Sequence, residues 1–337
     1  MVKKHIFSIL TFCCISITMY SQEYLYLNQN KLLGTANPSL YGFDEEPHIG
    51  VAYSTQKVLN NESSIENSFA FGSNYFEDYN FTLALDVNLY QISTLGYSAT
   101  QANLHYIYKT KLTHDWVLNS SLSVGFGNNK LDFSSLVFED QLDVLTGNIA
   151  GFSLDPVNVN NKVSYFDFGA GAHIHNGYNM FFGFNLKHLN KPNISLNDDY
   201  NDNKDILISL QAGYEIELNR FRRSSLPRNS FLFLYGSATV QANKSRLDFY
   251  QEAILDNFSV GINQHVNNYE GTNLTTFGAS ASMFINQLEV GVNYSFETAS
   301  KKFTGASYNY FEIFMLFDFY DLRLSRGRNN SRFYNLN

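Results

Sequence analysis

Two histidines at strand spacing are the first candidates for chemistry in this chain. His173 and His175 would share one face of a β-strand, because alternate residues of a strand point to the same side. Asp167 lies on that face six residues earlier. Two imidazoles and one carboxylate are a common ligand set for zinc. The alternative, which we favour, is a pair of histidines bonded to water in a wet interior.

Two acidic groups are also candidates for chemistry. Glu215 and Glu217 share a strand face, and a second group consists of Asp198, Asp199, Asp202 and Asp205. The second group lacks the ordered Asp-x-Asp-x-Asp-Gly spacing of a calcium loop. We therefore interpret both sets as solvated charge.

Other catalytic signatures are missing from the sequence. Both cysteines, Cys13 and Cys14, lie in an N-terminal leader, so the mature chain carries no thiol for a disulfide, a zinc site or a nucleophile. No Gly-x-Ser-x-Gly elbow, His-Glu-x-x-His helix or phosphate-binding glycine loop occurs. We therefore expect no enzymatic activity and no cofactor. The formal net charge of −8 argues against nucleic acid as a partner.

The elements that would position these residues are strands of about ten residues with alternating polarity. From Tyr79 to Tyr90, apolar residues such as Leu83 and Leu85 alternate with polar residues such as Asp86. This pattern predicts a strand with one apolar face and one polar face. It recurs in Trp116–Gly127, Ile206–Leu218 and Leu288–Glu297. The face assignment predicts that arginine at Leu85 is costly and that Asp86→Asn costs little.

The repeated pattern predicts an all-β fold, a transmembrane antiparallel β-barrel of about 14 strands with both termini periplasmic. No apolar run after the leader reaches the roughly 18 to 20 residues of a spanning helix, and a closed barrel is the other way to cross a bilayer. Aromatic residues make up 16% of the chain, which suits interfacial girdles. The alternative is a large secreted β-sandwich or β-helix.

The domain organisation follows from the leader. Residues 1–21 have the basic start, apolar core and small final residue of a signal peptide, with lipid attachment at Cys13 as the alternative. Residues 22–45 then form a periplasmic N-terminal segment, and residues 46–337 form the barrel. The longest connections, Asn128–Lys162 and Leu189–Asp205, fall outside the cell in this scheme. Asn219–Ser230, with four arginines, falls inside, either as a solvated loop or as a dock for an acidic partner.

Short motifs in a fixed order resemble one known family. The chain begins its barrel after an Asn-Pro-x-x-x-Gly element and continues with a Tyr-x-x-Gln element, acidic residues in the long loop, a strand with Asp-x-Gly, and His-Leu-x-x-Pro at a strand end. The residues are Asn37, Pro38, Gly42, Tyr53, Gln56, Phe138, Asp140, Gln141, Asp167, Gly169, His188, Leu189 and Pro192. This order resembles the PorP/SprF family of outer-membrane proteins, which accompany the type IX secretion system of Bacteroidetes.

The resemblance implies a function. Such proteins are located in the outer membrane, contact its lipid, act with other type IX secretion components, and hold a cognate secreted protein at the cell surface through its C-terminal sorting domain. Their cargo includes adhesins for gliding motility. Since loops on a rigid scaffold carry recognition, we expect partner contacts at Phe138, Asp140, Gln141, His188, Leu189 and Pro192. The alternatives are a passive or substrate-specific channel and a barrel with no dedicated partner.

Overall fold

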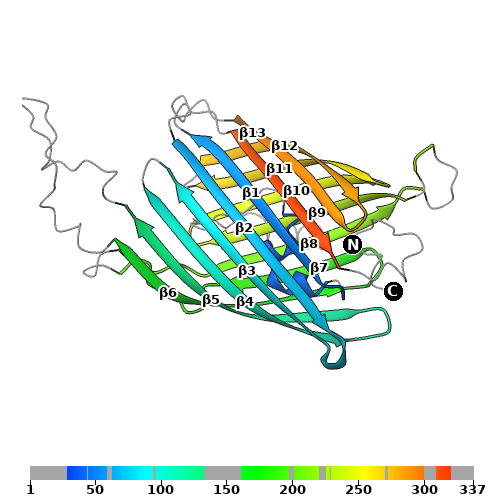
Figure 1. Ribbon diagram of the computed structural model, residues 1–337, viewed down its shortest axis with the longest axis horizontal. Coiled ribbons are helices and arrows are strands. Elements are labelled where there is room, and N and C mark those ends of the chain that lie inside the picture. The colour runs from blue at the N-terminus through cyan, green and yellow to red at the C-terminus, as the bar shows by residue number, and fades with distance from the viewer. Residues whose placement is uncertain are drawn as a thin grey trace, which may run out of the picture.

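The computed structural model shows a closed barrel of fourteen antiparallel strands (Figure 1). It describes residues 29–43, 45–58, 63–93, 96–132, 161–196, 201–219, 225–227, 229–269, 272–299 and 309–319. The strands are β1 (His48–Val58), β2 (Ser63–Phe76), β3 (Phe81–Ile92), β4 (Tyr97–Lys111), β5 (Val117–Leu131), β6 (Lys162–His175), β7 (Met180–Lys187), β8 (Leu207–Glu217), β9 (Ser230–Gln241), β10 (Lys244–Leu255), β11 (Phe258–Tyr269), β12 (Thr272–Ile285), β13 (Leu288–Ala299) and β14 (Asn309–Asp318). The predicted fold and strand number are confirmed.

Each strand pairs with its neighbours in the chain, and the first and last strands close the barrel. His48 at the start of β1 pairs with Asp318 at the end of β14. The start of β1 and the end of β14 therefore lie at the same rim of the barrel, which we call the terminal end. We call the opposite rim the distal end. The connections that contain residues 132–161 and 188–206 are both at the distal end, as the predicted alternation of connections requires.

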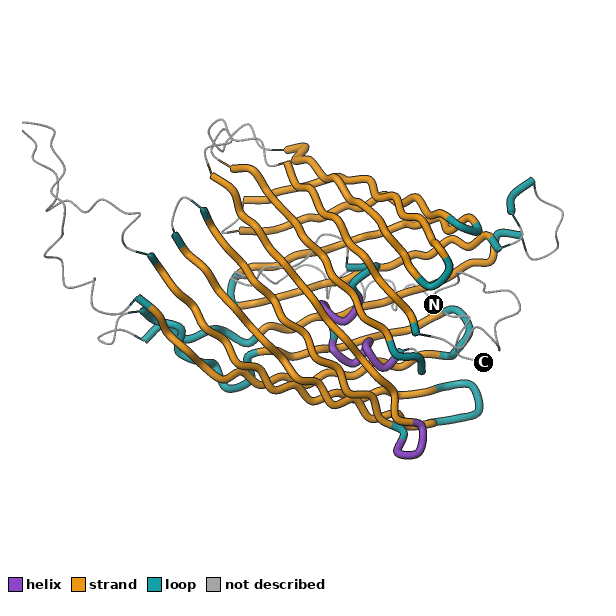
Figure 2. The backbone as a smooth tube through the Cα atoms, in the orientation of Figure 1, coloured by secondary structure: helices purple, strands orange, loops and turns teal. Residues whose placement is uncertain are grey.

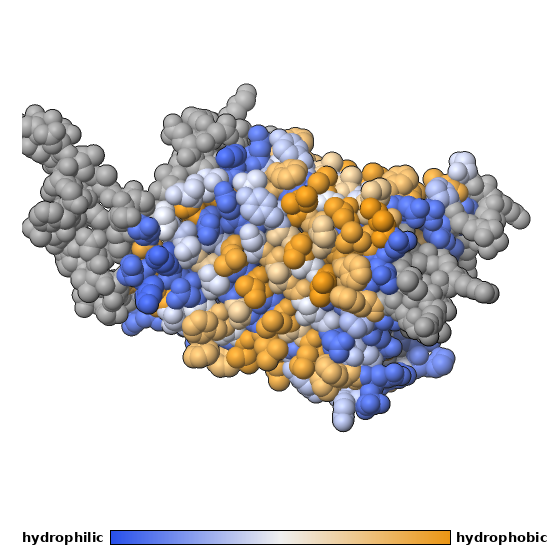
Figure 3. All heavy atoms as spheres, in the orientation of Figure 1, coloured by the Kyte–Doolittle hydropathy of each residue, from blue (hydrophilic) through white to orange (hydrophobic). Residues whose placement is uncertain are grey.

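The two faces of the wall differ as the period-two pattern predicts. In β3, Leu83, Leu85 and Leu89 are exposed on the outside, whereas Thr82, Ala84 and Asp86 are buried on the inside. Figure 3 shows the result as an apolar band across the middle of the wall with polar residues toward both ends. Such a band is what the hydrocarbon region of a bilayer requires of a barrel. Within the described part of the chain, no helix is long and apolar enough to span a membrane.

One turn at the terminal end is specified by its own side chain. Between β6 and β7, Gly177 adopts a positive φ of 70°, which glycine tolerates without strain. Asn176 Oδ1 accepts hydrogen bonds from the backbone N–H groups of Tyr178, Asn179 and Met180. The predicted Asn-Gly turn is therefore present, and it lies at the terminal rim as expected.

The lumen is not empty. Residues Gln29–Phe43, which we call the plug, include the short helix α2 (Leu33–Ala36) and the 3-10 helix η1 (Pro38–Gly42), drawn within the barrel in Figure 2. Most plug side chains are buried against inward-facing residues of the wall, and Asn37 and Ser39 are 0% exposed. The sequence predicts a periplasmic segment at residues 22–45, but the described plug lies inside the barrel. Its polar residues bond to wall residues more than 100 positions away.

Candidate functional site

Many buried polar and ionisable side chains lie at the contact between the plug and the inner wall. One side of this contact is an apolar cluster. In it, Leu40 and Phe43 of the plug pack against inward-facing aromatic residues such as Phe181, Phe233 and Tyr235. The Phe43 and Phe181 rings meet edge to face at 5.6 Å. The lumen face of β7, β9 and β10 is therefore apolar where the plug covers it.

Asn37 links the plug to three strands. Its Oδ1 accepts from Ser39 N at 3.1 Å and from Ser39 Oγ at 2.8 Å, which caps the start of η1. Its Nδ2 donates to the carbonyl oxygens of Ala172 and Phe184 and to Gln211 Oε1, at 3.1 to 3.3 Å. The Asn-Pro element found in the sequence is thus an anchor of the plug, with Pro38 setting the first residue of η1.

Glycines in the wall make room for this amide. A Cβ atom at Gly171 would lie 2.6 Å from Asn37 Oδ1, and one at Gly183 would lie 2.8 Å from Asn37 Nδ2. Both distances are too short for a real contact, so any side chain at these positions would displace the plug. Gly171 of β6 and Gly183 of β7 therefore make room for the plug.

Gly171→Ala should loosen the plug. Overpacking of this kind costs about 1–3 kcal/mol, because the new methyl group must push away Asn37 or Ser121. Hydrogen exchange of residues 29–43 should accelerate while exchange of the strands stays unchanged. Gly236→Ala is the matched control, since its Cβ would find no atom closer than 3.7 Å. Equal exchange in the two variants would contradict the assignment.

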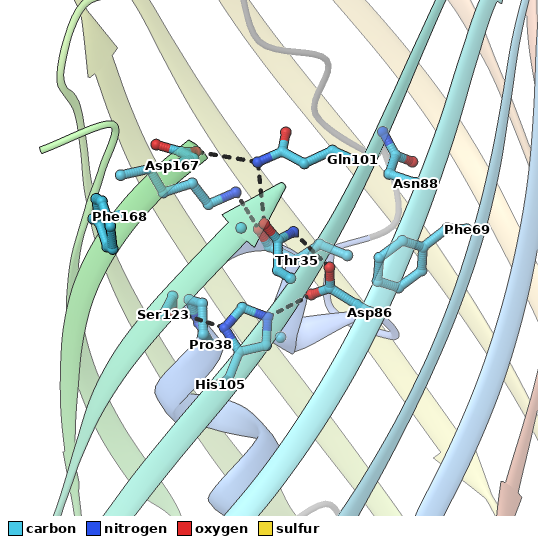
Figure 4. Close-up of a pocket in the computed structure, with 15 residues that line it drawn as sticks. Thr35, Pro38, Phe69, Asp86, Asn88, Gln101, His105, Ser123, Asp167 and Phe168 are labelled. Carbon is cyan, nitrogen blue, oxygen red and sulfur yellow. Dashed lines mark hydrogen bonds and ion pairs between the residues drawn. The ribbon is translucent and has the colours of Figure 1, made fainter. Parts of the chain in front are cut away.

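Beside the plug, an acid–base network crosses four strands (Figure 4). His105 Nε2 lies 2.8 Å from Asp86 Oδ2, and its Nδ1 lies 2.7 Å from Ser123 Oγ. Asp86 also accepts from Asn103 Nδ2 at 2.7 Å and from Tyr41 of the plug at 3.1 Å. The network thus ties the plug to β3, β4 and β5.

A second aspartate–histidine pair continues the network. Asp167 Oδ2 lies 2.7 Å from His188 Nδ1 and accepts from Gln101 Nε2 at 3.1 Å, and the same Nε2 donates to Asn103 Oδ1. Asp167, Gln101 and Asn103 line a cavity of about 60 Å³ between the plug and the wall, enough for a few water molecules. The cavity is too small for an organic substrate of ordinary size.

The order Asp86, His105, Ser123 has the partners of a nucleophilic triad, but its surroundings do not suit acyl transfer. Ser123 lies in the middle of β5 and is paired with His105 on one side and Gly169 on the other. Its neighbouring N–H groups belong to the sheet ladders, so they cannot form an oxyanion hole. The arrangement is better explained as a set of buried polar groups that satisfy one another.

The two histidines considered as zinc ligands hold the plug instead. His173 lies 3.0 Å from Ser39 Oγ through Nδ1 and 3.2 Å from Asn119 Nδ2 through Nε2. His175 stacks on His173 and packs on Phe43. Among the described residues, no three His, Cys, Asp or Glu side chains converge as a metal site would need. Asp167, the third proposed ligand, is paired with His188.

The His-Leu-x-x-Pro element forms a turn that continues the sheet beyond the short β7. Leu189 N donates to Phe168 O, Asn190 Nδ2 donates to Phe166 O, and Asn190 Oδ1 accepts from Phe168 N. His188 adopts a φ of 60°, an uncommon conformation that its buried bond to Asp167 supports. The turn thereby satisfies the edge of β6 that β7 does not reach.

The structure separates the sequence-predicted site residues into several environments. His188 and Pro192 are buried and Leu189 is 41% exposed, so of these three predicted contact residues only Leu189 presents its side chain at the surface. Tyr53 faces outward on β1, whereas Gln56 lies on the lumen side. Gly42 and Gly169 face the plug contact, where added Cβ atoms would meet Ile107 and Leu186 O. Phe138, Asp140 and Gln141 lie outside the described residues.

The structure describes four of the six acidic candidates. Glu215 is buried on the lumen face, whereas Glu217 is exposed at the terminal end of β8. Asp202 and Asp205 are exposed, and Asp198 and Asp199 lie outside the described residues. Beside them, Lys204 Nζ lies over the Tyr165 ring at 6.0 Å, and Gln241 Nε2 donates to Asp205 O. The connection after β7 therefore packs against the distal ends of β6 and β9.

A closed fourteen-stranded barrel with an apolar outer band and a plugged lumen defines the class of outer-membrane β-barrels. The family model for the type IX secretion system membrane protein PorP/SprF matches residues 18–317, and the chain belongs to this family. The protein is accordingly an outer-membrane protein. No curated protein matches the chain.

Solved barrels resemble the chain in fold only. The TodX deltaS2S3 mutant, a monoaromatic hydrocarbon channel, aligns with a TM-score of 0.50 and 10% identity over 90% of this chain and 97% of its own. CymD, another monoaromatic hydrocarbon channel, gives 0.49 and 11% over 90% and 95%. Omp33 of Acinetobacter baumannii gives 0.46 and 10% over 82% and 100%.

Proposed function

We propose that this barrel assists secretion of a cognate protein and anchors it at the cell surface through that protein's C-terminal sorting domain. Membership of the type IX secretion family over residues 18–317 supports a role with other secretion components. Adhesins of gliding motility are the cargo class that the family suggests. The barrel acts without enzymatic chemistry, as a scaffold whose distal rim binds the cargo.

The observation that favours an anchor over a channel is the plug. A barrel of fourteen strands is wide enough to hold an aqueous lumen, but here Asn37, Leu40 and Tyr41 bind to opposite parts of the wall and fill its centre. A diffusion channel needs a continuous wet path, whereas an anchor needs only a rigid rim. The orientation with the distal rim outside the cell is part of this proposal.

Shortening the connection after β7 tests the anchor. A variant in which residues 195–201 are replaced by a short Gly-Ser turn keeps Ile194 and Asp202, and with them the bridge between Asn193 and Asn203, as well as the His188 turn. We expect surface display of the cargo to be lost while barrel assembly, judged by heat-modifiable gel mobility, is normal. Gly-Ser replacement of Thr113–Asp115 at the terminal rim is the control and should leave display intact. A second variant without residues 133–160 completes the test.

Planar-bilayer recording separates the anchor from the channel. The intact protein should show no steady conductance, because the plug blocks the lumen. A steady open pore, together with normal display in both loop variants, would favour the channel instead.

A further inference from the structure

One lysine of the plug occupies a socket built by four consecutive strands. Lys31 Nζ contacts a carboxylate from β10 (Glu252), hydroxyls from β11 (Ser259) and β12 (Ser282), and a carboxylate from β13 (Glu289). The distances are 2.5 Å to Glu289 Oε1 and 3.2 Å to each hydroxyl. Each strand contributes one inward residue near its terminal end.

The socket has the features that select a primary ammonium group. An ammonium has three N–H donors and no acceptor, and here it meets only acceptors. The Phe284 and Phe314 rings lie 5.7 Å from Nζ, within range of a cation–π contact. Lys31 is 6% exposed, so the charge is almost completely removed from water.

Both carboxylates accept further hydrogen bonds besides those from Lys31. Glu252 Oε2 accepts from Asn30 Nδ2 at 3.0 Å, and Glu289 Oε1 accepts from Ser282 Oγ at 2.6 Å. Two buried acids therefore converge on one cation. Without Lys31 they would repel each other in a low-dielectric site, which makes an unpaired carboxylate costly.

This contact differs in kind from the other plug contacts. Between Gln29 and Phe43 the sequence holds one lysine and no other charged residue. The later part of the plug is held by the neutral bonds of Asn37 and by the apolar packing of Leu40 and Phe43. Lys31 is therefore the one charged side chain of the plug itself, while two charged wall residues bond to neutral plug groups: Lys187 Nζ donates to Thr35 O, and Asp86 Oδ2 accepts from the Tyr41 hydroxyl.

We infer that Glu252, Ser259, Ser282 and Glu289 form an ammonium-binding socket in the barrel wall, and that Lys31 in this socket is the latch that seats the first part of the plug. The socket takes a primary ammonium group, supplied in this structure by the chain itself. The latch governs residues 29–36, whereas residues 37–43 stay seated through the bonds of Asn37 and Tyr41 and the apolar packing of Leu40 and Phe43.

Hydrogen exchange of the purified full-length barrel measures the latch directly. Lys31→Met should speed exchange in residues 29–36 by roughly a hundredfold or more, because the buried pair is broken, while residues 37–43 and the strands change little. Lys57→Met removes an exposed lysine at the end of β1 and is the matched control. Unchanged exchange in Lys31→Met would overturn the latch.

A charge exchange keeps the test decisive if Lys31→Met fails to assemble. Lys31→Glu alone places three acids together, whereas Lys31→Glu with Glu289→Lys restores one cation between two acids. Slow exchange of residues 29–36 in the double variant and fast exchange in the single variant support the latch. Equally fast exchange in both would overturn it.

The ligand class is tested with small cations. In Lys31→Ala, ethylammonium chloride should raise the melting temperature, whereas tetramethylammonium, which has no N–H donor, should not. Equal effects of the two salts would overturn the ammonium assignment. None of these measurements involves a secreted partner, so they stand independently of the proposed anchoring function.

Discussion

Leu85→Arg should lower the free energy of unfolding in phospholipid vesicles by about 2–4 kcal/mol, the cost of placing a guanidinium near the middle of the hydrocarbon layer. Leu85 is 54% exposed on the outside of β3 and pairs with Gly72 and Leu104 on the neighbouring strands. It therefore points into lipid from well inside the apolar band. Urea titration followed by the fluorescence of the single tryptophan, Trp116, provides the measurement.

Position along the wall provides the control for this prediction. Leu112 is similarly exposed, at 49%, but lies beyond the end of β4 at the terminal rim. Leu112→Arg should cost about 0–1 kcal/mol, because an arginine at the interface reaches water. Equal costs at the two positions would show that the apolar band does not coincide with the bilayer core.

The barrel wall was predictable from the sequence because its information is local. Alternation at period two assigns each residue of β3, β5, β8 and β13 to a face, and the count of such segments gives the strand number. Chain order then specifies every antiparallel pair except the closing pair of β1 and β14, since consecutive strands are neighbours. Nothing beyond neighbouring residues is needed for these steps.

The plug was not predictable by the same reasoning. Residues 29–43 have no strand period, and their partners are remote in sequence, as Asn37 and Gln211 show. A short segment with one charge and several small residues is equally compatible with a solvated linker. The wall glycines that fit it, such as Gly171, read as ordinary lumen residues until the plug is placed against them.

The polar network needed the strand register. The register places Asp86 opposite Asn103, His105 opposite Ser123, and Asn103 opposite Gly125. A shift of one residue would move these side chains to the lipid face. Sequence alternation shows that each of them faces the lumen, but only the register shows that they meet.

Asp86 is therefore the residue for which structure most changes the expected effect of mutation. The alternating pattern predicts that Asp86 faces a solvated lumen, where Asp86→Asn would cost little. In the structure it is 5% exposed and accepts from His105, Asn103 and Tyr41. We expect Asp86→Asn to lower the free energy of unfolding by about 3 kcal/mol. A buried charged acceptor is lost, and its donors must form new hydrogen bonds with an amide group. The same vesicle titration measures it.

Graded variants separate the network from a general effect on β3. Tyr41→Phe removes one donor from the plug and should cost about 1 kcal/mol. Combined with Asp86→Asn it should add much less than its own cost, because the two side chains share one hydrogen bond. Asp78→Asn, at an exposed position between β2 and β3, should stay within about 0.5 kcal/mol of wild type. Full additivity of Tyr41→Phe and Asp86→Asn would mean that the plug and the wall aspartate are stabilised separately, and the lumen network would then lose its role in seating the plug.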